Sequence, residues 1–140
     1  LAWAGIQVTV GIDMALFGWL PEAKALVLGA DSLMATGVVN KLGTAPLVRA
    51  AAALDLPRIV VCTTDKFLPS DYVASYSLRD GAPDEIMSVS NDNITVRNPY
   101  FDVTPLELVS LVVTERGPLV GSALNQALAQ IRTYPGLRGR

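Results

Sequence analysis

The fold class of this chain is decided by residues 25–31, Ala-Leu-Val-Leu-Gly-Ala-Asp. A short apolar run that ends in Gly-Ala-Asp predicts a buried strand that delivers a carboxylate, that of Asp31, at its C-terminal end. In open α/β sheets, ligands bind in the crevice outside the carboxyl ends of the strands. The stretch therefore predicts an α/β domain in which Asp31 lies where such domains hold their ligands.

Further apolar runs, bounded by glycine, proline and polar residues, predict alternating strands and helices. The predicted strands are residues 6–12, 25–28, 58–62, 94–96 and 108–114. The predicted helices are residues 14–20, 44–54, a helix that starts at Thr104, and residues 123–133, which Ser122 caps. This alternation gives one α/β domain over residues 1–140, with a mainly parallel sheet flanked by helices.

The remaining stretches predict a turn and a long loop. Residues 35–37 form the turn, which leads to Asn40 and Lys41. Residues 66–93 show no clear period, and a stretch of that length is usually functional or disordered rather than scaffold. We expect an active-site loop or a subunit contact there.

Composition narrows the class of protein. The chain is 51% hydrophobic, but no apolar run approaches the roughly 18 residues that span a bilayer. With 11 basic and 13 acidic residues the net charge is −2, so nucleic-acid binding has little support. We expect a soluble, cytoplasmic protein that contacts no membrane and buries part of its apolar surface against another subunit.

The absence of histidine excludes several kinds of catalytic centre. It removes Ser–His and Cys–His nucleophilic catalysis and every zinc site that contains histidine. The single cysteine, Cys62, excludes cysteine-rich metal sites and suits a reducing compartment. We expect no metal site, and we expect Cys62 to be a small buried side chain.

Polar residues that follow the predicted strands are expected on one rim of the sheet. Asp13, Asp31 and the segment 63–66 come at successive strand ends, and Asn40 and Lys41 follow Asp31 within about a dozen positions. An acid, polar contacts and a helix N-terminus at Thr44 that could hold an anion outline a sugar-phosphate site. A structural interpretation stays open for each residue: a loop cap, a turn, an ion pair or a helix cap.

Four motifs, in order, resemble one protein family. They are residues 29–32 (Gly-Ala-Asp-Ser), 40–41 (Asn-Lys), 98–105 (Asn-Pro-Tyr-Phe-Asp-Val-Thr-Pro) and 114–117 (Thr-Glu-Arg-Gly). The family unites ribose-1,5-bisphosphate isomerase, methylthioribose-1-phosphate isomerase and the alpha, beta and delta subunits of translation initiation factor 2B. Within it, the Gly-Ala-Asp-Ser, Asn-Lys and Thr-Glu-Arg-Gly motifs most resemble the ribose-1,5-bisphosphate isomerase branch.

The resemblance implies a Rossmann-like C-terminal domain, which a helical domain precedes in full-length members. It implies that Asp31 is the proton donor and that Asn40, Lys41 and Lys66 contact the sugar phosphate. The catalytic cysteine and the phosphate-binding arginine of the family lie upstream and have no counterpart here, and Cys62 does not match that cysteine. We therefore expect the chain to be part of a longer protein.

Three aspartates have structural as well as functional interpretations. Apolar neighbours such as Leu33 and Met34 are expected to raise the pKa of Asp31 by desolvation, as a general acid requires. Asp102 could orient Lys66 or a substrate hydroxyl, or simply pin the adjoining turn, which we favour. The structural interpretation is also favoured for Asp13.

The sequence thus predicts the C-terminal domain of a sugar-phosphate aldose–ketose isomerase, active as a homo-oligomer and needing no cofactor. A regulatory subunit of the translation initiation factor 2B type, which senses a phosphorylated ligand, is the alternative. A dimerisation domain with a vestigial pocket is a third and weaker one. Asp31 together with Asn40 and Lys41 favours the enzyme.

Overall fold

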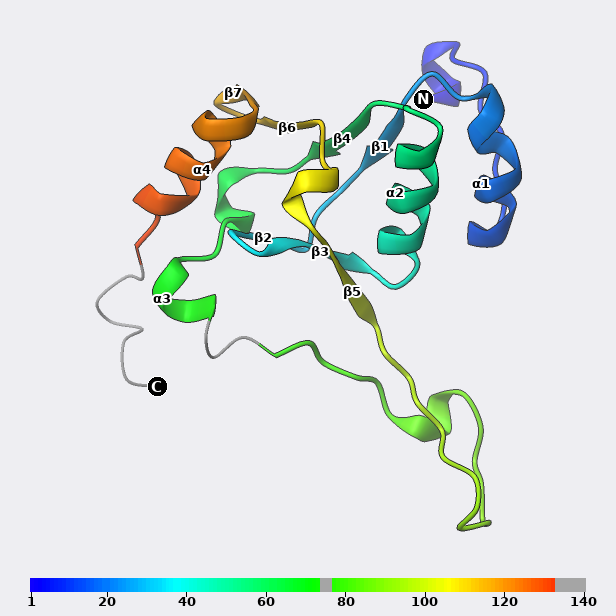
Figure 1. Cartoon of the computed structure of the whole chain (residues 1–140). Helices are drawn as coiled ribbons and strands as arrows, with labels where there is room; N and C mark the ends of the chain where they lie inside the picture. The colour runs from blue at the N-terminus through cyan, green and yellow to red at the C-terminus, as the bar shows by residue number, and fades with distance from the viewer. Residues whose placement is uncertain (74–76, 133–140) are drawn as a thin grey trace.

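The computed structural model describes residues 1–73 and 77–132. Its larger sheet has four strands in the order β1 (Leu26–Leu28), β4 (Arg58–Val61), β6 (Leu111–Thr114) and β7 (Gly117–Leu119) (Figure 1). β1, β4 and β6 run parallel, and β7 returns antiparallel to β6. This confirms the mainly parallel sheet and the strands predicted at residues 25–28 and 58–62, whereas the strand predicted at residues 108–114 begins only at Leu111, after a 3-10 turn.

A second, antiparallel sheet was not expected from the sequence. It consists of β2 (Ser32–Met34), β3 (Gly37–Lys41) and β5 (Phe101–Thr104), in that order. The predicted turn at residues 35–37 joins β2 to β3 as a hairpin. A side chain at Gly37 would place its Cβ 2.5 Å from the carbonyl oxygen of Thr104, so glycine is required at this point of the pairing between β3 and β5.

The helices are α1 (Asp13–Trp19), α2 (Thr44–Ala53), α3 (Ser70–Val73) and α4 (Gly121–Gln130). Helix α2 contacts β4 and β5, α1 contacts α2, and α4 packs on the larger sheet. Val60 and Val112 have no exposed surface, and they pack with Leu33 of β2 and with Leu124 and Leu128 of α4. Burying each such side chain contributes about 1.5–3 kcal/mol, so this contact holds the two sheets and α4 together.

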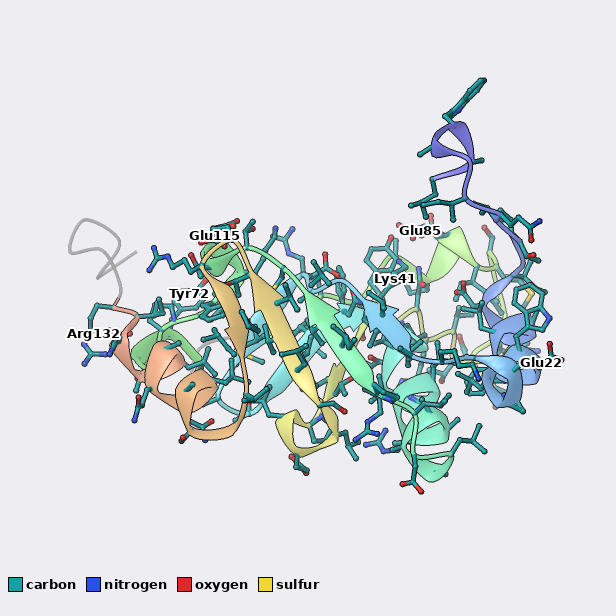
Figure 2. The ribbon with its side chains drawn as sticks, turned by 90° about the horizontal axis from the view of Figure 1, so that it is seen from above. Glu22, Lys41, Tyr72, Glu85, Glu115 and Arg132 are labelled. Carbon is teal, nitrogen blue, oxygen red and sulfur yellow. The ribbon has the colours of Figure 1, made fainter. Side chains whose placement is uncertain are left out.

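The opposite face of the larger sheet is apolar and partly open. Its register rows consist of Val27, Ile59 and Leu111, followed by Val61 and Val113. Val27 is 60% exposed and Val61 is 49% exposed. Figure 2 views the strands from this side, with no helix drawn across β1 and β4. Parallel strands are ordinarily covered on both faces, and residues 1–73 and 77–132 leave this apolar face partly uncovered.

Residues 77–100 form an arm that extends away from the two sheets (Figure 1). Its two sides meet where Asp80 bridges Pro99 and where the Gly81 amide donates to the Asn98 carbonyl at 2.7 Å. The strand predicted at residues 94–96 is wrong, because this part of the arm carries no strand pairing. The predicted loop starts later than expected, since Lys66 ends a short helical turn and Phe67 is buried.

Three other predictions are wrong in detail. Residues 6–12 are exposed and unpaired rather than a strand, because a strand needs a neighbour with which to form hydrogen bonds. Thr104 ends β5 instead of capping a helix, and only the 3-10 turn Leu106–Leu108 follows it. Helix α4 begins at Gly121, with Ser122 inside it and no side-chain cap. Residue 133, the predicted end of that helix, lies outside the described residues.

Candidate functional site

The carboxyl edge of the parallel strands carries Asp31 and Lys66, whereas Asp13, which the sequence predicted at the same rim, begins helix α1 because no strand precedes it. Asp31 follows the end of β1 by three residues, and the 3-10 turn Thr64–Lys66 follows β4. Glu115 follows β6 directly. Because parallel strands end at the same edge, Asp31, Lys66 and Glu115 share one rim of the sheet. This is the edge where open α/β sheets bind ligands.

Asp31 lies beside the β2–β3 hairpin, and Asn40 lies near the end of β3. The Asp31 amide donates to the carbonyl of Val39 at 2.9 Å, and Val39 is also the register partner of Ser32. Asn40 is the register partner of Asp102 on β5. The structure therefore attaches Asp31 to β3 one residue before Asn40, and pairs Asn40 with Asp102.

The apolar enclosure expected around the Asp31 carboxyl is not formed by the described residues. Leu33 and Met34 are buried in the core, whereas Asp31 itself is exposed. Asp31 precedes β2, which begins at Ser32, so the packing that buries Leu33 and Met34 does not enclose its side chain. Any water-excluding cover for the Asp31 carboxyl must therefore come from elsewhere.

Asp102 caps helix α2 across the sheet. Its carboxylate accepts hydrogen bonds from the amides of Gly43, at 2.9 Å, and Ala45, at 3.1 Å. Gly43 is the N-cap residue and has a φ of 102°, which glycine adopts without strain. A carboxylate at a helix N-terminus satisfies free N–H groups and complements the helix dipole. The favoured structural role of Asp102 is thus supported, although it fixes the start of α2 and not the turn after β5.

Thr44 adds a side-chain hydrogen bond to the same turn at the start of α2. Its hydroxyl donates to the carbonyl of Lys41 at 2.7 Å, and the residue is buried. The N–H groups of Gly43 and Ala45 are already bound to Asp102. The anion cradle suggested by the Gly-Thr sequence is therefore filled, in part, by the protein's own carboxylate.

Lys41 is exposed and lies over an aromatic ring. Its Nζ atom is 4.5 Å from the centre of the Tyr100 ring, and the Tyr100 hydroxyl donates to Glu85 of the arm. The hydrogen bond from Tyr100 lowers the pKa of Glu85, and the same bond raises the pKa of Tyr100. Lys41 and Glu85 lie close together in Figure 2. The arm therefore forms part of the surroundings of Lys41.

A cavity of about 460 Å³ lies between α1 and the start of α2. Asp13 and Lys41 are the charged residues of its lining, and Gly43, Thr44 and several apolar side chains complete it. Asp31, Asn40, Lys66 and Asp102 do not line it. Of the predicted site residues, Asp13, Lys41 and Thr44 thus line the cavity, whereas Asp31, Asn40 and Lys66 lie outside it.

Lys66 lies on a segment that is tied to β2. Phe67 forms a parallel bridge with Leu33, two residues after Asp31, and the Leu68 amide donates to the Leu33 carbonyl at 2.8 Å. Lys66 is half-buried. The predicted closeness of Lys66 to the Asp31 strand therefore has a structural basis.

Cys62 and Glu115 also lie at this rim of the larger sheet. Cys62 is half-buried, and burial together with the nearby Asp65 raises the pKa of its thiol, as expected of a small buried side chain. Glu115 accepts two hydrogen bonds from Thr64, which lower the pKa of its carboxyl. Glu115 belongs to the Thr-Glu-Arg-Gly motif, but the sequence predicted no role for it in the site. An acidic residue in a tight turn at a strand end is the signal that points to it.

Across residues 1–73 and 77–132, no cluster of three or more His, Cys, Asp or Glu side chains suits a metal ion.

Comparison with known proteins identifies the family. Residues 1–120 match the model of the initiation factor 2 subunit family. The chain belongs to this family. It is 35% identical over 141 residues to the ribose 1,5-bisphosphate isomerase of Archaeoglobus fulgidus, covering 96% of this chain and 44% of that protein. The enzyme of the same name from Methanocaldococcus jannaschii is 35% identical over 118 residues, which cover 81% of this chain and 38% of that protein.

Solved structures show the same fold. The delta subunit of translation initiation factor eIF-2B from A. fulgidus superposes with a TM-score of 0.77 at 25% identity, covering 91% of this chain and 41% of that chain. The 5-methylthioribose 1-phosphate isomerase of Pyrococcus horikoshii gives 0.73 at 24% identity, covering 90% and 38%. The chain thus spans less than half the length of the relatives that it matches. Among the described residues, no helix is both long and apolar enough to cross a membrane.

Proposed function

We propose that residues 1–140 are the Rossmann-like C-terminal domain of a longer sugar-phosphate aldose–ketose isomerase. The substrate in this proposal is ribose 1,5-bisphosphate and the product is ribulose 1,5-bisphosphate. One observation carries the proposal: beyond the carboxyl end of β1, the Asp31 amide is bound to Val39, the residue next to Asn40 on β3, with Lys41 and Lys66 on the adjoining segments. The similarity to ribose 1,5-bisphosphate isomerases supports it.

Each residue has a role that its chemistry suits. Asp31 donates a proton to the ring oxygen as the sugar opens, and a cysteine of the upstream polypeptide handles the carbon-bound proton. Asn40 binds hydroxyl groups, and Lys41 and Lys66 bind phosphate oxygens through charge-assisted hydrogen bonds. Asp13, Thr44 and Asp102 shape the site without touching the reacting atoms. These roles need an acid and a base, so the proposal includes no metal or organic cofactor.

The substitution Asp31→Asn in the longer protein tests this function. Asparagine keeps the shape and the backbone hydrogen bond but cannot donate a carboxyl proton. We expect kcat to fall about 10²–10⁴-fold, the usual contribution of a positioned acid or base, with substrate affinity within a few-fold of the parent.

The control variant is Asp55→Asn, at the exposed end of α2, which should keep the parent's kcat. An Asp31→Asn protein with the parent's turnover would remove Asp31 from the mechanism. The alternative, a regulatory subunit that senses a phosphorylated ligand, would then gain support, in keeping with the similarity to the eIF-2B delta subunit.

We also propose that the protein works in the cytoplasm as a homo-oligomer. The partly open apolar face of the larger sheet and the exposed apolar side chains of the arm support association. The single cysteine suits a reducing compartment.

A further inference from the structure

The turn between β6 and β7 holds the segment that carries Lys66. Glu115 lies in this turn, and its carboxylate accepts two hydrogen bonds from Thr64, 51 residues earlier. The Thr64 amide is 2.9 Å from Oε2 of Glu115, and the Thr64 hydroxyl is 2.5 Å from Oε1. Both carboxylate oxygens of Glu115 are therefore bound to one residue of the 3-10 turn that ends at Lys66.

The turn that presents Glu115 is itself well fixed. Thr114 is buried, and its hydroxyl donates to the Gly117 carbonyl at 3.0 Å and accepts from the Arg116 amide at 3.1 Å. The Cys62 amide donates to the Val113 carbonyl at 3.1 Å and so extends the pairing of β4 with β6 up to this point. Glu115 is thus held by its own turn before it binds Thr64.

The Lys66 segment is anchored at two points. At its start, Glu115 binds Thr64, and at its end the buried Phe67 and the following residue attach to Leu33 of β2. Within the segment, the Lys66 amide donates to the Thr63 carbonyl at 3.1 Å. Lys66 therefore lies between a carboxylate anchor on β6 and a backbone anchor on β2.

We propose that Glu115 is the positioning residue for Lys66, and that it holds the lysine where it binds a phosphate group of the substrate. This inference rests on the proposed function, which gives Lys66 its phosphate contact. A lysine side chain loses rotamer entropy when it binds a ligand, so an unanchored backbone would weaken its contact further. The ion pair of Glu115 with Arg116 is exposed and 3.5 Å long, and such pairs contribute little. The hydrogen bonds to Thr64 are therefore the main interaction of the Glu115 side chain.

Steady-state kinetics of the longer protein test this role. Glu115→Ala removes both acceptors, and we expect KM for ribose 1,5-bisphosphate to rise about tenfold, with kcat within about threefold of the parent, because a binding contact is lost. Glu115→Gln keeps an acceptor for the Thr64 amide and should stay within about threefold in KM. The control, Glu107→Ala, alters an exposed acid in the turn before β6 and should change neither constant.

An unchanged KM in Glu115→Ala would overturn the inference. A large and equal fall of kcat in Glu115→Ala and Glu115→Gln would also overturn it, because Glu115 would then take part in the chemistry directly.

Amide hydrogen exchange and substrate binding separate this inference from the proposed function. In Glu115→Ala we expect exchange at residues 64–67 to accelerate about tenfold or more, and in Glu115→Gln much less. Unchanged exchange in Glu115→Ala overturns the inference. If the parent binds ribose 1,5-bisphosphate without turning it over, and Glu115→Ala weakens that binding, the role of Glu115 is supported and the isomerase proposal is refuted.

Discussion

At the scale of the residue, Lys41 shows how a neighbouring ring prepares a cation for a ligand. Its ammonium group lies over Tyr100, and the Tyr100 hydroxyl is bound to Glu85 of the arm. A ring face attracts a cation by about 0.5–1 kcal/mol at an exposed site. That is too weak to neutralise the charge but enough to restrict where it points. Lys41 is therefore held at the cavity wall with its charge available.

Replacing this lysine should weaken substrate binding more than catalysis. In the longer protein, Lys41→Ala removes a charge-assisted contact worth about 1.5–3 kcal/mol, so we expect KM to rise about 10–100-fold with kcat within a few-fold. Lys24→Ala is the matched control, because Lys24 is exposed and precedes β1 at the opposite edge of the sheet. A parent-like KM in Lys41→Ala would contradict a phosphate contact at this position.

At the scale of the element, helix α2 depends on a strand that lies far away in the sequence. Asp102 of β5 binds the amides of Gly43 and Ala45, which are 59 and 57 residues away. The first-turn N–H groups of a helix need such partners, since the helix cannot supply them itself. The β3–α2 connection, which follows Lys41, is thereby fixed by β5.

Loss of this cap should destabilise the protein measurably. We expect Asp102→Ala to lower the free energy of unfolding by about 2 kcal/mol, near the upper end for an N-cap, and Asp102→Asn to lower it less, because one acceptor oxygen remains. Urea unfolding measures both. Asp84→Ala, an exposed acid on the arm, should change stability by no more than about 0.5 kcal/mol. Equal losses in Asp102→Ala and Asp84→Ala would contradict the capping role.

At the scale of the whole molecule, two surfaces expose apolar side chains. One is the outer face of the larger sheet, with Val27 and Val61, and the other is the arm, with Ile86 and Met87 at 60% and 51% exposed (Figure 1). Exposed apolar patches of this kind mark surfaces that bind further protein. We therefore propose that further polypeptide covers these two surfaces.

We expect the protein to associate with itself through the arm. Sedimentation velocity should show a dimer or larger oligomer at tens of micromolar, roughly the range in which a firm dimer forms. Ile86→Lys should weaken the association at least tenfold. Leu54→Lys, at the exposed end of α2, should not. A monomer at that concentration, or equal effects of the two substitutions, would argue against association through the arm.

The sequence by itself determined the parallel strands and the position of Asp31. Residues 25–28, 58–62 and 108–114 are apolar runs between turn residues, and burial of such runs is a local property of composition. The hairpin turn at residues 35–37 and the helix from Thr44 were predictable for the same reason. The motifs that resemble the family could also be read without a structure.

Only the tertiary structure decided which polar groups meet. The bonds from Gly43 to Asp102 and from Thr64 to Glu115 join residues 59 and 51 positions apart, so no local pattern contains them. Residues 6–12 have the composition of a strand but stay unpaired, because a strand exists only when another strand accepts its hydrogen bonds. The sequence determines which chemical groups each segment carries, whereas the fold determines which of these groups meet. The site depends on both.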